Sequence, residues 1–392
     1  MGQARRVVFL DHCAAWSGGE IALLRLLEAL DTSRSLVVLG EDGPLAARLA
    51  EAGVEVRVLP LDPRTNRLGR DRAARVPWRS VVDVARYVWR LRGLLREVRP
   101  DLVHANSLKS GVYGSLAARL AGVPVVWHVR DRVADDYLPA AVVRLVRALL
   151  LLLPDAVLTN SEATRATLGG AVRRAVPHAV LGDPFRPTLP TPPRTRPHPR
   201  PTVALVGRLS PWKGQHLFLD ALATLHRQGV DVRGRLLGQA LFGEDEYAAE
   251  VTRRAAELDA QVGAFTGDVG EALGDVDVVV NASVVPEPFG QVVVEAIAHG
   301  VPVVVPDTGG PSEIVRDAVS GLTFTAGDAD DLAAVLALLL ETPELYRRLS
   351  EGGLDRARDY APERIAAEFE GFTGSVRRES PARRLLRAAR RR

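Results

Sequence analysis

The chain has 392 residues, of which 47% are hydrophobic and 25% are charged, and its formal net charge is +3 at pH 7. Both fractions are close to those of ordinary globular domains, which argues against a disordered chain and against a membrane-embedded one. The length exceeds that of one ordinary core and predicts two domains of roughly 150 to 200 residues each.

The first residues of the sequence do not resemble a signal peptide. Arg5 and Arg6 lead directly into the apolar residues 7–10, a run too short for a signal peptide, which predicts a buried first strand. The longest apolar stretch, residues 140–153, is interrupted by arginines and falls short of the roughly 20 residues that span a bilayer. Cys13 is the single cysteine, so no internal disulfide can form. We expect a cytoplasmic protein.

Residues 1–182 alternate short β-branched runs with longer helical patterns, as a parallel α/β sheet requires. The helical segments, such as residues 22–30 and 80–98, show apolar residues every three or four positions. The predicted strands are residues 7–10, 36–39, 54–59, 102–104, 123–127 and 156–159. The sequence predicts one doubly wound, Rossmann-like domain.

Residues 183–201 contain eight prolines in nineteen positions, which predicts an interdomain linker. The alternation then resumes in residues 202–360, which we predict to be a second Rossmann-like domain. Its strands are residues 202–206, 234–237, 278–281 and 302–305, and its helices are residues 215–228, 246–258, 290–299 and 329–340.

Two further segments follow the second domain. We expect residues 361–376 to form a helix that packs back on the N-terminal domain. Residues 377–392 carry eight arginines against the single Glu379, and we predict a disordered basic tail.

Open α/β sheets bind ligands beyond the carboxyl ends of their strands. The segment GRLSPWKG, residues 207–214, follows the predicted strand 202–206 and places Arg208 and Lys213 on a loop that opens a helix. Two cations there suit a diphosphate leaving group, whose negative charge grows as a glycosidic bond breaks. The alternative is a surface loop with two solvated cations.

A second segment, residues 281–295, also runs from a strand end into a helix. Glu287 falls in its turn and could accept hydrogen bonds from sugar hydroxyls, while the amides of residues 289–291 stand where a helix N-terminus would hold phosphate. Glu295 lies two turns further and could reach a ribose. For isolated glutamates, the preference of acidic residues for helix starts is the simpler explanation.

The order of GRLSPWKG, EPFGQVVVE and TGGPSEIV closely resembles that of the retaining glycosyltransferases of family 4. That family has the GT-B fold, in which two Rossmann-like domains face a cleft, and the resemblance runs over nearly the whole chain. It implies that residues 1–182 form the acceptor domain and residues 202–360 the nucleotide-sugar donor domain. It implies that Arg208 and Lys213 bind the donor diphosphate, while Glu287 contacts the sugar and Glu295 the ribose. The catalytic residues implied are Arg208, Lys213, Glu287 and His128, and the donor-binding residues are Gly18, Gly19, Gly207, Phe289, Gly290, Glu295 and Thr266.

Four of these residues depend most on the resemblance. Gly18 and Gly19 follow the first strand, like a glycine-rich loop that closes on the donor phosphates in relatives. His128 follows a predicted strand and corresponds to a histidine near the sugar and acceptor, although a lone histidine there is more often structural. Thr266 lies in a loop that sits by the base in relatives.

No metal is expected to be obligatory. Asp275 and Asp277 form a D-x-D string like that of a different glycosyltransferase fold, but here it begins a buried strand, so we predict a structural role. The resemblance implies transfer with retention, from a UDP- or GDP-sugar to a hydroxyl of a small-molecule, glycan or lipid-linked acceptor. We expect attack on the same face of the sugar as the departing phosphate, which takes the proton of the acceptor.

An arginine-rich segment, residues 62–79, leads into a helix with further arginines beside Trp89. It could bind a phosphorylated acceptor or the anionic inner face of a membrane, or it could be a solvated loop, and the basic tail has the same alternatives. No nucleic acid partner is expected.

Other functions stay open at this point. The GT-B fold also serves sugar-nucleotide epimerases and phosphorylases, and a non-catalytic nucleotide-sugar-binding protein would share it. A nicotinamide-dependent oxidoreductase is disfavoured because no G-x-G-x-x-G follows a predicted strand.

Overall fold

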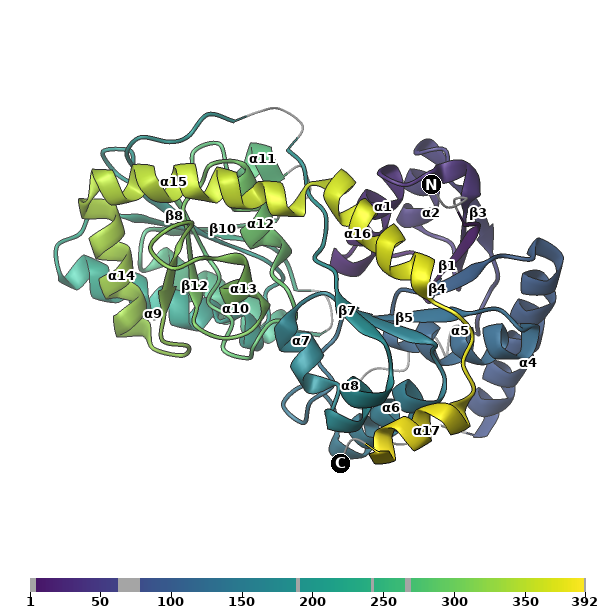
Figure 1. Cartoon of the computed structure of the whole chain (residues 1–392). Coiled ribbons are helices and arrows are strands. Elements are labelled where there is room, and N and C mark those ends of the chain that lie inside the picture. The colour runs from purple at the N-terminus through teal and green to yellow at the C-terminus, as the bar shows by residue number, and fades with distance from the viewer. Residues whose placement is uncertain (1–4, 63–77, 188–190, 241–242, 265–268, 391–392) are drawn as a thin grey trace. The chain divides into compact units, whose positions relative to one another are not determined.

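The structure is a computed structural model that describes residues 5–62, 78–187, 191–240, 243–264 and 269–390. It divides into two compact units (Figure 1). Unit 1 comprises Met1–Pro184 and Pro362–Arg392, and unit 2 comprises Phe185–Ala361. No helix in the described part of the chain has the length and apolar character that crossing a bilayer requires.

Unit 1 contains a seven-stranded parallel sheet in the order β3-β2-β1-β4-β5-β6-β7. Strand order reverses direction between β1 and β4, which is the switch point where doubly wound sheets bind ligands. The strands are β1 Val7–Asp11, β2 Ser35–Leu39, β3 Glu55–Val58, β4 Leu102–Ala105, β5 Val125–Val129, β6 Ala156–Thr159 and β7 His178–Val180.

Helices cover both faces of this sheet, so successive residues of the central strands enter different cores. Phe9 packs with Leu27 of α1 and Phe369 of α16, whereas Leu10 packs on the opposite side with Leu91 of α4. The helices are α1 Gly18–Glu28, η1 Thr32–Arg34, α2 Pro44–Glu51, α4 Trp78–Val98, α5 Leu108–Ala121, α6 Ala140–Leu152, α7 Glu162–Thr167, α8 Gly170–Ala175, α16 Pro362–Ser375 and α17 Pro381–Arg390.

Unit 2 contains a six-stranded parallel sheet in the order β10-β9-β8-β11-β12-β13. It has its own two cores, with Leu205 in one and Val206 in the other. The strands are β8 Thr202–Val206, β9 Arg233–Leu237, β10 Ala260–Gly263, β11 Val278–Val280, β12 Val303–Pro306 and β13 Leu322–Phe324. The helices are η3 Pro211–Lys213, α9 Gln215–Arg227, α10 Asp245–Ala256, α11 Val269–Ala272, α12 Gln291–Ala298, α13 Gly310–Ile314, α14 Ala329–Glu341, α15 Pro343–Ala357 and η4 Arg358–Tyr360.

The proline-rich segment is attached to unit 2. The guanidinium of Arg194 donates hydrogen bonds to the carbonyls of Leu273 and Val276, and its backbone N–H donates to Ser350 Oγ at 2.8 Å. Arg194 thus fixes this part of the predicted interdomain linker to unit 2.

The C-terminal part of the chain returns to unit 1, where α16 lies beside α1 (Figure 1). Phe369 of α16 is 1% exposed, and its ring centroid lies 5.9 Å from that of Phe9. The prediction of a disordered tail is wrong for residues 381–390, which form helix α17. The reason is Arg384, which is fully buried against the main body of unit 1.

Candidate functional site

In unit 2 the predicted donor residues gather at the carboxyl ends of β8 and β11. Gly207 follows β8 with a φ of 153° and donates a hydrogen bond to the carbonyl of Leu237. Gly238 follows β9, and a Cβ at that position would lie 2.0 Å from the carbonyl oxygen of Gly207. Only glycine therefore allows the two loops to approach this closely.

Gly214 joins the loop of Arg208 and Lys213 to the residues that follow β11. Its φ is 73°, and a Cβ there would lie 1.8 Å from the carbonyl oxygen of Ala282. This contact places Lys213, one residue earlier, next to the turn that carries Glu287.

Lys213 and Glu287 form a largely buried ion pair, with 2.5 Å between Nζ and Oε1 and side-chain exposures of 16% and 13%. The second carboxylate oxygen, Oε2, accepts hydrogen bonds from Asn281 Nδ2 at 2.7 Å and Ser283 Oγ at 3.0 Å. Burial acts to raise the pKa of Glu287, but the charge of Lys213 and these hydrogen bonds together lower it below its ordinary value. The carboxylate is therefore ionised and can only accept hydrogen bonds.

Asn281 and Ser283 are site residues to which the sequence analysis gave no role. Both follow β11, and each donates to the same carboxylate oxygen of Glu287. The available signal was their position, because polar side chains directly after a buried strand lie at the edge where such sheets bind ligands.

The turn after Glu287 packs closely against Gly310 at the start of α13. The N–H of Gly310 donates to the carbonyl of Glu287 at 2.8 Å, and a Cβ on Gly310 would lie 2.4 Å from Cα of Phe289. Phe289 is 5% exposed, so its side chain belongs to the core and only its backbone is a candidate for ligand contacts. Gly290 has a φ of 109° and caps α12.

The remaining donor residues are placed as follows. Arg208 lies near Glu244, with 3.6 Å between the guanidinium and Oε1, and its carbonyl accepts a hydrogen bond from Gln215. Glu295 lies inside α12 and is 5% exposed. Thr266 falls outside the residues that the structure describes.

The D-x-D string has structural partners, as predicted from its place before a buried strand. Asp275 pairs with Arg235 through both carboxylate oxygens, and Asp277 accepts hydrogen bonds from the N–H groups of Thr202 and His198.

In unit 1, Gly18 and Gly19 form the first turn of α1 after the N-cap Ser17. Asn106, directly after β4, donates from Nδ2 to the carbonyl of Gly19 at 3.1 Å and to Asp11 Oδ2 at 2.7 Å. Its Oδ1 accepts a hydrogen bond of 2.8 Å from Arg130, which also pairs with Asp183. This buried network holds the glycine-bearing turn at the switch point of the sheet.

The prediction that His128 follows its strand is wrong. His128 lies inside β5 and is 1% exposed. Its Nδ1 lies 3.3 Å from His104 Nε2, and burial together with the charge of Arg130 holds the pKa of His128 well below its ordinary value. The neutral ring is half of a buried histidine pair, and its Nε2 has no hydrogen-bond partner among the described residues. Arg130, two residues further, is the side chain that reaches the Gly19 turn.

Asp11, His12, Cys13 and Glu20 are the described residues whose ligand atoms come close enough to hold a metal, within 4.8 Å of one another. They already bond to each other, because His12 Nδ1 lies 3.0 Å from Asp11 and Cys13 Sγ donates to Glu20 at 3.2 Å. Burial and the charges of Glu20 and Asp11 raise the pKa of the Cys13 thiol, which disfavours the thiolate that binds metals. These four residues form a cluster held together by hydrogen bonds among their own side chains.

Both halves of the chain match known family models. Residues 192–356 match the model described as glycosyl transferases group 1, and residues 17–183 match the model described as glycosyl transferase 4-like domain.

Curated relatives agree with these matches. The D-inositol 3-phosphate glycosyltransferase of a Nocardioides species is 30% identical over 301 residues, which are 68% of this chain and 66% of that protein. The GDP-mannose-dependent alpha-mannosyltransferase of Mycobacterium tuberculosis is 30% identical over 265 residues, 61% of this chain and 64% of that one. The chain spans about two thirds of the length of the curated relatives it matches. The crystal structure of Anabaena HepE in complex with UDP-glucose is similar with a TM-score of 0.79 and 26% identity, covering 95% of this chain and 100% of that one.

Proposed function

Because the chain belongs to the glycosyl transferases group 1, with two Rossmann-like units of the GT-B type, we propose that it transfers a sugar from a UDP- or GDP-sugar to an acceptor hydroxyl with retention of anomeric configuration. The relatives support both donor classes, since one is named for GDP-mannose and HepE was solved with UDP-glucose. Inositol phosphate is the first acceptor to test, because the matched relatives from a Nocardioides species, Streptomyces scabiei and Saccharomonospora viridis are all named D-inositol 3-phosphate glycosyltransferase.

The observation that carries the proposal is the cluster of Lys213, Glu287, Asn281 and Ser283 at the strand ends of unit 2. An ammonium has three donors, so Lys213 can hold Glu287 with one and serve a diphosphate oxygen with another. Glu287, kept ionised, accepts hydrogen bonds from sugar hydroxyls. The pair thus provides charge stabilisation for the leaving group and orientation for the sugar at one point.

The other residues have supporting roles in this proposal. Arg208 adds a second cation for the diphosphate, Glu295 binds the ribose, and the backbone N–H groups of Phe289 and Gly290 face the phosphate at the start of α12. Gly18 and Gly19 contribute backbone donors from unit 1. We assign His128 to the acceptor side through the family resemblance alone, since its ring is buried, including the Nε2 atom that has no hydrogen-bond partner among the described residues.

We propose that catalysis needs no metal, because the cations of Arg208 and Lys213 stand where the leaving diphosphate would gain charge. The acceptor proton passes to the departing phosphate oxygen on the same face of the sugar. We also propose a cytoplasmic location with peripheral contact to an anionic membrane.

Nucleotide release from UDP- and GDP-sugars, measured with inositol phosphate and without it, tests the proposal. Release that depends on the acceptor and yields a retained linkage supports transfer, and release without acceptor indicates an epimerase or hydrolytic activity instead. We expect Lys213→Ala and Arg208→Ala to lower kcat by about a hundredfold each and Glu295→Ala to raise KM for the donor. Full activity in EDTA is expected, and loss restored by magnesium would contradict the metal-free assignment.

A further inference from the structure

Helix α17 turns an apolar stripe away from unit 1. Ala382, Leu385, Leu386 and Ala389 recur at the spacing of one helical face, and all four are exposed. Leu385 and Leu386 are 46% and 59% exposed. An amphipathic helix of a globular domain ordinarily packs such a stripe against the core. The outward orientation of the stripe on α17 therefore calls for a structural explanation and indicates a binding surface.

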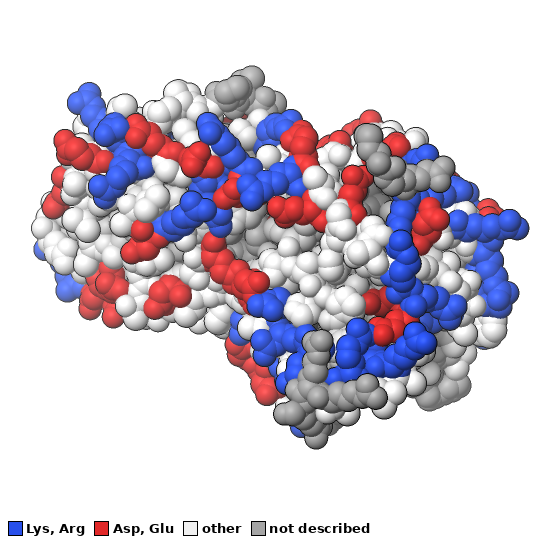
Figure 2. Space-filling view, viewed as in Figure 1, with Lys and Arg blue, Asp and Glu red and all other residues white. Residues whose placement is uncertain are grey.

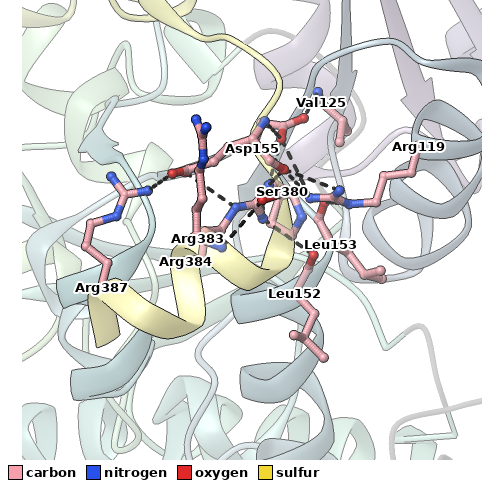
Figure 3. Close-up of polar contacts among 11 residues, drawn as sticks. Arg119, Val125, Leu152, Leu153, Asp155, Ser380, Arg383, Arg384 and Arg387 are labelled. Atoms are coloured by element: carbon pink, nitrogen blue, oxygen red, sulfur yellow. Dashed lines mark hydrogen bonds and ion pairs between the residues drawn. The ribbon is translucent and has the colours of Figure 1, made fainter. Parts of the chain in front are cut away.

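The cause is the arginine on the opposite side of the helix (Figure 3). Arg384 is fully buried, and it pairs with the equally buried Asp155 at 2.7 Å and donates to the carbonyls of Pro154 and Glu379. Asp155 is further fixed by the N–H groups of Val125 and Glu379. Burial lowers the pKa of Arg384 to about 10, so the guanidinium stays charged at neutral pH and cannot rotate out without breaking a buried ion pair.

The neighbours of the stripe are basic. Helix α17 packs against α6 and α8, and the three helices together contain eight arginines and no acidic residue. Exposed members include Arg144, Arg173 and Arg383, and Leu145 of α6 adds another leucine that is 55% exposed. Figure 2 shows basic side chains gathered over this part of unit 1. Two acidic groups that contact α17 are already paired, Glu379 with Arg387 and Asp155 with Arg384.

We propose that this α17 face, formed by α17 with the exposed sides of α6 and α8, docks on an anionic lipid bilayer. Leucines at the boundary of headgroups and acyl chains, flanked by arginines over anionic headgroups, are the combination that holds an interfacial helix in place. A second copy of the chain fits less well, because stacking two such faces would bring arginines against arginines. Nucleic acid would use the arginines but leave the leucine stripe in water.

The inference names the surface that makes the peripheral membrane contact, and it does not depend on the transfer reaction. Buried Arg384 acts as the residue that fixes which side of α17 meets the lipid. A failure of the membrane experiment therefore leaves nucleotide-sugar transfer untouched, and a failure of transfer leaves the docking proposal standing.

Co-sedimentation of the full chain with vesicles of phosphatidylcholine alone, or with phosphatidylglycerol added, tests the proposal. We expect binding to the anionic vesicles, weakened by salt, and little binding to the neutral ones. The double substitution Leu385→Ser and Leu386→Ser should lower the bound fraction at least about tenfold, because it removes the inserted leucines and leaves Arg384 in place. Leu338→Ser is the matched control, since Leu338 of α14 in unit 2 is 54% exposed and should be replaceable without effect.

Several results would overturn the proposal. One is wild-type binding by the double variant, and another is failure of the wild-type chain to bind anionic vesicles at low salt. Loss of binding on Val82→Ser with Trp89→Ser alone would assign docking to α4, which also exposes large apolar side chains. A dimer in solution that dissociates in the Leu385 and Leu386 variant would identify a second copy as the occupant.

Discussion

At the scale of single residues, the proposed donor site depends most on the buried ion pair of Lys213 and Glu287. The sequence predicted both residues as ligands of the donor but treated them as independent contacts. Structure places them 2.5 Å apart, which requires Gly214 and Ala282 to bring two loops together. That contact joins residues 74 positions apart, and neither segment alone contains a signal for it.

Glu287 makes the stability of unit 2 depend on pH. Its folded pKa is lowered from an ordinary value of 4.5, so the contribution of this carboxylate is fully present above pH 4.5 and is lost as the pH falls through the folded pKa. Glu287→Gln should cost about 1–3 kcal/mol at neutral pH and should flatten the acid loss of stability, because no carboxylate is left to protonate. Urea unfolding followed between about pH 6 and pH 3 measures both effects.

The control for this measurement is Glu351→Gln, which removes one member of an exposed pair with Arg347. It should change the free energy of unfolding by less than about 1 kcal/mol and leave the pH slope as in the wild type. Equal slopes for wild type and Glu287→Gln would show that Glu287 is not held ionised by its partners.

The histidine shows where residue-scale prediction fails. A residue's distance from the end of its strand fixes whether it reaches solvent, and an error of two positions moved His128 from the site edge into the core. Arg130 is the first residue after β5, and its guanidinium donates a hydrogen bond to Asn106. An arginine directly after a strand is common, so the sequence alone does not mark it as a site residue. Its contact with the Gly19 turn does.

At the scale of elements, glycines determine how closely the loops approach. Gly214 and Gly229 both belong to unit 2 and have φ values of 73° and 82°, but only Gly214 has a neighbour in the way, since nothing lies within 4 Å of a Cβ at Gly229. Gly229→Ala should cost about 1 kcal/mol for the left-handed backbone. Gly214→Ala adds a clash with Ala282 and should cost at least about 2 kcal/mol more, measured by urea unfolding. An equal loss of unfolding free energy in the two variants would show that the loop of Ala282 moves aside to accommodate the added methyl group.

Helix α17 provides the second prediction at this scale. Arg384→Met keeps the length of the side chain but leaves Asp155 with only Arg119, 3.6 Å away, as a charged partner. We expect α17 to lose about 3 kcal/mol of local stability, seen as faster amide hydrogen exchange in residues 381–390. Arg387→Met is the control in the same helix, because Arg387 is 37% exposed and its pair should be worth less than about 1 kcal/mol. Unchanged exchange in the Arg384 variant would mean that the ion pair does not anchor the helix.

Periodicity predicted the long buried elements and missed those held by specific contacts. Strands β7, β10 and β13 have three or four residues each and were not predicted, because such short runs carry little pattern. The arginine-rich composition of residues 377–392 suggested disorder, and nothing in it reveals that Asp155, more than 220 positions earlier, binds Arg384.

At the scale of the whole molecule, the chain divides into two compact units, each with its own hydrophobic cores. The alternation of strands and helices predicted both sheets, and the break between the two units falls at Pro184 and Phe185, inside the proline-rich segment 183–201. The second crossing, at Ala361 and Pro362, gives unit 1 a C-terminal part that includes α16.

This division predicts how a nucleotide stabilises the chain. Lys213, Glu287 and Glu295 all belong to unit 2, so UDP or GDP should raise the stability of that unit by RT ln(1 + [L]/Kd), about 2.7 kcal/mol at a hundredfold excess over Kd. Scanning calorimetry should resolve an unfolding transition of unit 2, whose midpoint temperature is lowered by Gly214→Ala. Added nucleotide should raise the midpoint temperature of the same transition. Glu295→Ala should reduce the upward shift, whereas Arg384→Met should leave it unchanged and lower the transition of unit 1. A nucleotide that shifted only the Arg384-sensitive transition would place the main donor contacts in unit 1, against the assignment of Lys213 and Glu287.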